Sequence, residues 1–275
     1  MSRLTATFDA LRARGEKGLV TFVTASDPDR DRSAAVLRAI AKAGADVLEI
    51  GVPFSDPIAD GPAIQRATER ALRAGGTLAA SLDLVASVRS DIQAPIVIFS
   101  YANPVLRMGL DAFVERAAAA GVDGVLLLDL PIEESAGAHA ALDRRGIDQI
   151  FLVSPTTTPE RLAEAGRLGR GFLYAISRLG VTGTRDTVAA TAAPLVARIR
   201  QATTLPVALG FGISTPEHVR LVWTIADAAV VGSALILALE KTARNADKPK
   251  RAAAFVARLK RAMRHASRQT LHPLT

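Results

Sequence analysis

Eight short runs of apolar and β-branched residues recur along this chain, separated by helical patterns. The runs lie at 19–24, 46–51, 95–101, 122–130, 148–153, 171–176, 206–212 and 227–232. They are almost continuously apolar, as strands are when both faces of a parallel sheet are covered. Strand followed by helix, repeated about eight times in 275 residues, predicts an α/β fold, the (β/α)8 TIM barrel. An open, doubly wound sheet is the alternative.

The helical patterns between the runs are rich in alanine, for example at 33–44, 110–121, 133–146 and 188–202. Two such patterns, 62–73 and 78–91, separate the second and third runs, which predicts an extra helix after the second strand. The N-terminal segment 1–18 has apolar residues at helical spacing and predicts a short amphipathic helix. With no linker or low-complexity tract, we expect residues 1–275 to form a single barrel domain.

Composition excludes several classes of function. The chain has no cysteine, which rules out disulfides, thiolate metal sites and a cysteine nucleophile. No apolar run approaches about 20 residues, so we expect no membrane span, and without a signal-peptide pattern we expect a cytoplasmic protein. The net charge is +7, with the densest basic segment at 247–268. We interpret that segment as the solvated face of a last helix rather than a nucleic-acid surface, because aromatic residues for base stacking are scarce.

Reactive side chains in such a barrel lie where the strands end, at their carboxyl termini. No lysine or histidine falls at such a position, so we predict no Schiff-base lysine, no histidine base and no metal site. Carboxylates remain: Glu49 at the end of the second strand, Asp56 and Asp60 in the following loop, and Asp129 at the end of the fourth. A carboxyl group in apolar surroundings has a raised pKa, which suits acid–base chemistry near neutral pH, and Glu49 is therefore the first candidate.

The other three carboxylates have simpler explanations on the residues alone. Asp60 precedes a helical pattern and is a candidate N-cap. Asp56 lies between Ser55 and Pro57, as a turn residue does. Asp129 could orient a neighbouring loop. These alternatives stay open at this point.

Glycine-rich segments at three strand ends predict a phosphate site. They lie at 180–183, 210–214 and 231–235, and the last two lead into helical patterns. Backbone amides in glycine-rich loops and at helix N-termini bind phosphate, and barrels of this kind often place that site after the seventh and eighth strands. The segment 177–186 also has the composition of a lid that closes over a ligand.

Taken together, these segments resemble the tryptophan synthase alpha chain family over about residues 5–264. The motifs that carry the resemblance are VTFVTASDPD at 20–29, LEIGVPFSDPIADGPAIQRA at 48–67, SYANPV at 100–105, AGVDGVLLLDLPIEE at 120–134, SRLGVTGTR at 177–185, GFGIS at 210–214 and VVGSAL at 230–235. The resemblance implies a lyase that cleaves indole-3-glycerol phosphate to indole and glyceraldehyde 3-phosphate. It implies no cofactor in this chain, and a pyridoxal-phosphate-bearing beta chain as partner in an alpha2beta2 assembly.

The resemblance also implies roles for individual residues. Glu49 is the general acid–base, and Asp60 assists at the indole nitrogen. The phosphate contacts are Gly183, Gly212, Gly232 and Ser233. The pocket wall comprises Phe22, Tyr101, Leu126, Tyr174 and Phe211, although Tyr174 could equally be a core residue. Thr182 closes the lid, and Pro53 and Asp56 face the beta chain.

Three departures from the family pattern stand out, and none removes a catalytic or phosphate residue. Ser26 and Ala102 replace a usual glycine and a usual aromatic residue, and the calculated pI of 10.3 is high. Three rival functions remain. They are a sugar-phosphate isomerase or epimerase on the same scaffold, a stand-alone indole-releasing lyase, and a non-catalytic activator of the beta chain.

Overall fold

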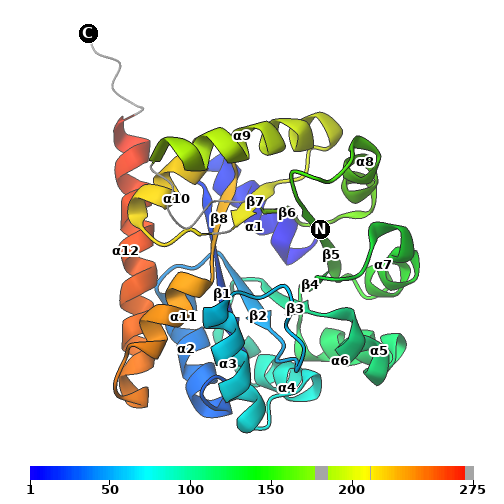
Figure 1. Cartoon of the computed structure of the whole chain (residues 1–275), viewed down its shortest axis with the longest axis vertical. Coiled ribbons are helices and arrows are strands. Elements are labelled where there is room, and N and C mark those ends of the chain that lie inside the picture. The colour runs from blue at the N-terminus through cyan, green and yellow to red at the C-terminus, as the bar shows by residue number, and fades with distance from the viewer. Residues whose placement is uncertain (177–184, 211, 270–275) are drawn as a thin grey trace.

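The computed structural model describes residues 1–176, 185–210 and 212–269. Parallel strands β1 to β8 follow one another around a closed barrel, in which β8 pairs back to β1 (Figure 1). The strands are β1 Gly18–Thr24, β2 Val47–Gly51, β3 Ile96–Ser100, β4 Gly124–Leu127, β5 Asp148–Val153, β6 Leu173–Ile176, β7 Val207–Gly210 and β8 Ala228–Val231. The predicted (β/α)8 barrel is confirmed, and the pairing of β8 with β1 excludes the open sheet.

Helices surround the barrel on its outside, except for α1, which lies at its amino-terminal end. They are α1 Arg3–Ala13, α2 Arg30–Lys42, α3 Pro62–Arg73, α4 Leu78–Val88, α5 Ala102–Met108, α6 Leu110–Ala120, α7 Ala136–Asp143, α8 Pro159–Leu168, α9 Arg185–Ala202, α10 Pro216–Trp223, α11 Ser233–Glu240 and α12 Lys248–Gln269. The predicted N-terminal helix and the extra helix after the second strand are both present. The short helix α5, which follows β3, was not predicted.

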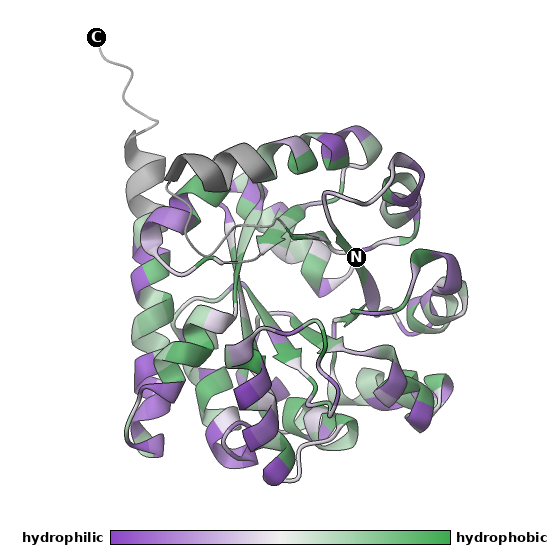
Figure 2. Cartoon of the chain, in the orientation of Figure 1, coloured by the Kyte–Doolittle hydropathy of each residue, from purple (hydrophilic) through white to green (hydrophobic). Residues whose placement is uncertain are grey.

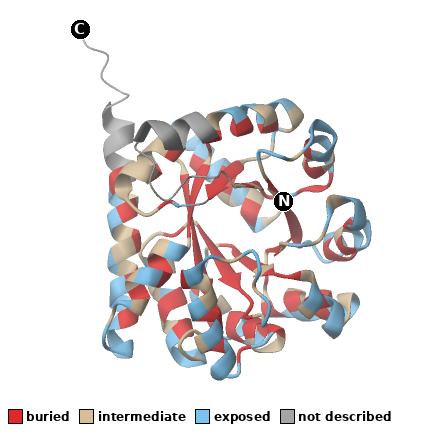
Figure 3. Ribbon diagram, in the orientation of Figure 1, coloured by how far each residue is buried: buried red, intermediate tan, exposed pale blue. Residues whose placement is uncertain are grey.

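Side chains alternate between the two faces of each strand, which divides the core into two parts. Val20, Val47 and Val97 pack inside the barrel, whereas Leu19, Leu48 and Ile96 face the surrounding helices. The strands are accordingly buried and apolar throughout, while hydrophilic residues lie on the outward faces of the helices (Figures 2 and 3). This two-sided burial explains why the strand sequences are nearly continuous apolar runs.

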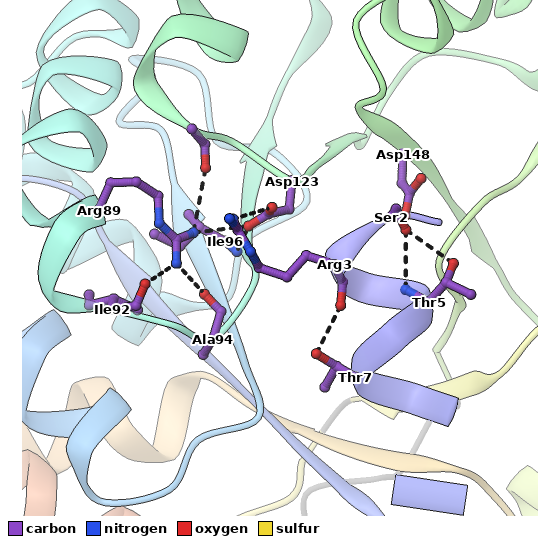
Figure 4. A network of polar contacts seen from close by, with 11 residues as sticks. Ser2, Arg3, Thr5, Thr7, Arg89, Ile92, Ala94, Ile96, Asp123 and Asp148 are labelled. Carbon is purple, nitrogen blue, oxygen red and sulfur yellow. Dashed lines mark hydrogen bonds and ion pairs between the residues drawn. The ribbon is translucent and has the colours of Figure 1, made fainter. Parts of the chain in front are cut away.

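Helix α1 closes the amino-terminal end of the barrel. Its apolar face packs into the interior cluster through Leu4 and Phe8. Polar contacts hold the same end: Arg3 pairs with Asp123 at 2.7 Å, and the Ser2 hydroxyl donates to Asp148 at 2.5 Å (Figure 4). Ligands therefore have access to the barrel interior from the opposite end, where the strands terminate.

The long helix α12 runs along one side of the molecule and packs against α2, α10 and α11 (Figure 1). Its apolar stripe includes the buried Val256 and Leu259. Arg251, Arg258 and Arg261 are exposed, as expected for a solvated basic face. Across residues 1–176, 185–210 and 212–269, the structure has no helix long and apolar enough to cross a membrane.

Candidate active site

Glu49 is the one acidic side chain on β2 and lies inside the barrel. Its strand neighbours in register are Phe22 on β1 and Val97 on β3. The residue has no exposed surface, and neither carboxyl oxygen has a hydrogen-bond partner among the described residues. Because burial disfavours the charged form, it raises the pKa of Glu49 from 4.5 to about 8. At neutral pH Glu49 is therefore mainly a neutral acid that is ready to give a proton.

Aromatic rings surround the space beside Glu49. The rings of Phe22 and Phe99 meet edge to face at 5.4 Å, and that of Tyr174 lies 6.4 Å from Phe99. Burial raises the pKa of the Tyr174 hydroxyl well above its usual value, and the nearby charge of Glu49 adds to the shift. Leu126, also buried, belongs to the same interior cluster. This arrangement forms an apolar wall suited to a flat aromatic ligand.

Glycines at the strand ends leave room for these aromatic rings. A Cβ atom built on Gly51 would lie 2.7 Å from a ring carbon of Phe22, and one on Gly210 would lie 2.8 Å from Cζ of Tyr174. One on Gly232 would lie 3.2 Å from Cβ of Phe22. Any side chain at the first two positions would therefore displace a wall residue.

The second carboxylate, Asp60, lies in the loop between β2 and α3. Tyr101 donates its hydroxyl hydrogen to Oδ2 of Asp60 at 3.3 Å and accepts the Ala59 N–H at 3.0 Å. Burial raises the pKa of Asp60, and the hydrogen bond from Tyr101 opposes that shift. The residue that caps α3 is Gly61, so the N-cap interpretation of Asp60 is wrong. Its side chain is instead paired with a tyrosine at the end of β3.

The remaining carboxylates have different positions. Asp129 accepts the backbone N–H of Ala102 at 2.6 Å, and so holds the first residue of α5. Asp56 is exposed and accepts a hydrogen bond from the Ser55 hydroxyl at 2.6 Å, in keeping with a turn. Pro53, in the same loop, is buried within this chain. Asp129 thus orients a neighbouring segment, as one of the sequence interpretations anticipated.

Helix α11 presents its first turn at the other side of the barrel mouth. Gly232 precedes it as an N-cap without a side chain, and Ser233 is its exposed first residue. The neighbouring helix α10 has its first turn capped by the Thr215 side chain, which accepts the His218 N–H. Gly212 is exposed and has a φ of 74°, a conformation that favours glycine. The uncapped amides of α11 are therefore available to an anion.

Three of the residues singled out from the sequence lie outside the described residues: Gly183, Thr182 and Phe211. Most of the segment 177–186, interpreted as a lid, lies there too. The structure brings Glu49, Phe22 and Tyr174 together inside the barrel and joins Tyr101 to Asp60.

One polar group at the mouth was missed by the sequence analysis. Thr24 follows Val20 and Phe22 at a spacing of two, so its side chain faces the barrel interior. It is 3% exposed, and its hydroxyl has no partner among the described residues. The alternation along β1 was the available signal, but a threonine in a strand is usually read as a strand former.

A metal ion has no evident place in the part of the chain that the structure describes. No group of three or more histidine, aspartate or glutamate side chains gathers there. The chemistry that the site can perform with its own side chains is proton transfer by Glu49, with Asp60 as a second, hydrogen-bonded carboxylate.

Comparison with known proteins places this arrangement in a family. The family described as "Tryptophan synthase alpha chain" matches residues 8–267. The alpha chain of Geobacter sulfurreducens is 49% identical over 96% of this chain and 99% of its own length. The alpha chain of Solibacter usitatus is 46% identical over 95% of this chain and 98% of its own length.

Solved structures agree. The tryptophan synthase alpha subunit of Legionella pneumophila superposes with a TM-score of 0.89 at 34% identity, covering 96% of this chain and 99% of that one. A chain of the Mycobacterium tuberculosis tryptophan synthase, in its aminoacrylate-bound form, gives a TM-score of 0.85 at 35% identity. The superposition covers 96% of this chain and 100% of the Mycobacterium tuberculosis chain.

Proposed function

The chain belongs to the tryptophan synthase alpha chain family, and from that premise we propose how its own residues carry out the reaction. The enzyme is a carbon–carbon lyase of tryptophan biosynthesis that cleaves indole-3-glycerol phosphate to indole and glyceraldehyde 3-phosphate, and it pairs with a beta chain. We assign Glu49 as the catalytic group because its side chain is fully buried, has no hydrogen-bond partner among the described residues, and has a pKa of about 8.

We propose that Glu49 shuttles one proton in two steps. Its neutral carboxyl group first protonates C3 of the indole ring, which leaves a carboxylate and a positively charged ring nitrogen. That carboxylate then removes the proton from the hydroxyl group on the adjacent carbon. The bond between this carbon and C3 breaks, an aldehyde forms, and the electron pair returns to the ring, which restores neutral indole. Glu49 ends the cycle protonated, so no other acid or base is required.

Asp60 stabilises the positive charge at the ring nitrogen. Its carboxylate would accept the N–H hydrogen bond while that charge develops, which is electrostatic stabilisation of the transition state. The hydrogen bond from Tyr101 supports this role, because it favours the ionised form of Asp60. The buried aromatic wall supports a planar indole beside Glu49. We assign that wall to Phe22, Tyr101, Leu126, Tyr174 and Phe211.

The phosphate group would bind at the opposite side of the mouth. We assign it to backbone amides at Gly183, Gly212 and Gly232 and to Ser233. The uncapped first turn of α11 supports this assignment, since amides and the helix dipole both favour an anion there. Thr182 would contribute to closure of the lid over the bound substrate.

The partner contacts remain proposals as well. The exposure of Asp56, together with Ile58, which is 87% exposed, supports a contact between this loop and the beta chain. Pro53 would act by shaping the loop, as it is buried in this chain. We further propose an alpha2beta2 assembly, a beta chain that holds the pyridoxal phosphate, no cofactor in this chain, a single domain over residues 1–275, and a cytoplasmic location.

The assignment is tested by measuring indole release from indole-3-glycerol phosphate, with and without a beta chain. We expect Glu49→Gln to abolish cleavage while binding of glyceraldehyde 3-phosphate persists, since the phosphate site is separate. Near-normal turnover in this variant would refute the role of Glu49. Wild-type cleavage that does not respond to a beta chain would favour a stand-alone lyase, and no cleavage under either condition would favour a non-catalytic activator.

A further inference from the structure

Four charged side chains form a continuous network between α3, α11 and the loop after β1. Arg66 on α3 donates two hydrogen bonds to Glu240, the last residue of α11, both at 2.7 Å. Arg70, one turn further along α3, donates to the same carboxylate at 3.1 Å. Arg70 also donates twice to Asp27, in the loop after β1, both at 2.8 Å. Three segments that are distant in sequence are thereby tied together.

The network joins the two halves of the proposed site. Helix α3 begins two residues after Asp60, and α11 begins at Ser233, in the proposed phosphate site. Helix α11 has only eight residues, about 12 Å in length, so a restraint at its last residue also restrains the direction of its first turn. Glu240 is therefore well placed to control where the α11 amides point.

An apolar contact lies between the same two helices. Ala63 and Ala67 of α3 pack with Ile236 of α11 and with Phe22, all of them buried. Phe22 in turn lies against Gly232, at the first turn of α11. Small side chains on α3 allow α11 to approach closely but provide little interlocking between these two helices. The ion pairs at the far end of α11 supply the directional restraint that the alanines lack.

The geometry distinguishes this network from ordinary surface ion pairs, which contribute little. Glu240 accepts from two guanidinium groups, and its side chain is only 26% exposed. A negative charge at a helix C-terminus is unfavourable against the helix dipole, so Glu240 is not there to stabilise α11 by itself. The Arg66 hydrogen bonds lower the pKa of Glu240 to about 2, which keeps it charged at every pH at which the enzyme would be assayed.

We propose that Glu240 is a positioning residue for substrate phosphate: through Arg66 and Arg70 it fixes α11 against α3 and so aims the amides at Gly232 and Ser233. This inference rests on the proposed phosphate site. It extends the functional site to a side chain at the opposite end of α11 from the phosphate.

The test compares Glu240→Gln with the wild type in the complex with a beta chain. We expect the Kd for glyceraldehyde 3-phosphate and the KM for indole-3-glycerol phosphate to rise at least about fivefold, with kcat changed less than about twofold. Glu240→Asp, which keeps the charge, should restore part of the affinity. Unchanged Kd and KM in Glu240→Gln would overturn the proposal.

A matched control separates positioning from general stability. Arg145 and Glu115 form a similar paired contact, with Nε to Oε1 at 2.7 Å, between the turn after α7 and α6. We expect Glu115→Gln to leave both Kd and KM unchanged. A similar rise in KM in that variant would count against a specific role of Glu240. Should Glu240→Gln fail to fold, Arg66→Gln replaces it, because Arg66 is 47% exposed, and the same rise is expected.

One further variant tells this proposal apart from the phosphate site on which it rests. Ser233→Asp places a negative charge at the first turn of α11, which favours the helix but repels phosphate. Lost phosphate binding in Ser233→Asp with normal binding in Glu240→Gln would refute only the positioning role. Normal binding in both variants would refute the phosphate site itself.

Discussion

Tyr101 and Asp60 are joined at the barrel mouth by a hydrogen bond of 3.3 Å, although 41 residues separate them in the chain. The tyrosine comes from the end of β3, and the aspartate from the loop after β2. Burial raises the pKa of the Tyr101 hydroxyl to about 12, so it remains a hydrogen-bond donor throughout the working range of pH. The Asp60 carboxylate, which we propose meets the indole nitrogen, is thus oriented by a tyrosine hydroxyl that stays protonated and keeps donating its hydrogen bond.

We therefore expect Tyr101→Phe to lower kcat/KM by about tenfold or more, because a hydrogen bond to a charged group contributes about 1.5–3 kcal/mol. If Tyr101 acts through Asp60, the double variant Tyr101→Phe/Asp60→Asn should be no slower than Asp60→Asn alone. Steady-state assays of the four proteins in this cycle provide the measurement. Fully additive losses would mean that Tyr101 acts independently of Asp60.

The buried Glu49 should make the stability of the protein depend on pH. Its pKa is about 8 in the folded state, against 4.5 when exposed, so between these values only the folded state holds the proton. The stabilisation that this protonated group provides is complete below pH 4.5. It falls by about 1.4 kcal/mol per pH unit as the pH rises from 4.5 to about 8, and is then lost.

Glu49→Gln removes that dependence, so we expect the variant to gain stability over the wild type from pH 5 to pH 8. Urea unfolding at pH 5, 7 and 9 measures the difference. A constant difference across the three values would contradict a pKa near 8 for Glu49.

Gly210 should not tolerate a side chain while Tyr174 is present. A Cβ atom there would lie 2.8 Å from Cζ of the tyrosine, and we expect Gly210→Ala to destabilise the protein by about 1–3 kcal/mol. Gly210→Ala/Tyr174→Leu should recover part of that loss, since leucine vacates the space.

Gly137 in α7 is the matched control for this prediction, because a Cβ there meets nothing within 4 Å. Gly137→Ala should be neutral or stabilising by up to about 1 kcal/mol. Denaturant unfolding of the four proteins checks these expectations. A Gly210→Ala protein as stable as the wild type would show that Tyr174 moves aside without cost.

Asp46 should stabilise the barrel more than an exposed ion pair would, because its side chain is only 16% exposed. It accepts the Leu19 N–H at 2.7 Å, just before β2, and pairs with Lys260 of α12 at 2.7 Å. We expect Asp46→Ala to cost about 2–4 kcal/mol, because it leaves a buried N–H and a half-buried ammonium group without partners.

For comparison, Asp91→Ala breaks the exposed pair between Arg38 and Asp91, at 2.6 Å, and should cost less than about 1 kcal/mol. Unfolding free energies of the two variants give the test. Equal losses would mean that the backbone contact of Asp46 contributes nothing beyond a surface ion pair.

Asp46 belongs to a set of aspartates that the sequence analysis did not recognise. Asp123 and Asp227 occupy the same place before β4 and β8, and accept backbone N–H groups from Ile96 and Val207 at the starts of β3 and β7. The available signal was an aspartate directly before an apolar run. Its partner lies on the preceding strand, however, so its function could only be recognised once the strands were paired.

Ser26 shows another limit of sequence analysis. Its φ of 62° lies in the left-handed region, which explains why the resemblance pointed to glycine at this position. The backbone N–H of Ser26 donates a hydrogen bond to the Ser33 hydroxyl oxygen at 3.2 Å. The sequence revealed the departure from the family pattern, but the conformation that makes glycine suitable there depends on how the loop returns to α2.

The sequence by itself determined the barrel, the extra helix after β2, and Glu49 as the foremost acid. Those conclusions depend on local periodicity and on which residues end each strand, and both are properties of consecutive residues. Tertiary structure alone decided which groups meet: Tyr101 with Asp60, and Arg66 with Glu240, 174 residues apart. It also decided the pKa of Glu49, because burial is produced by all the neighbouring strands at once.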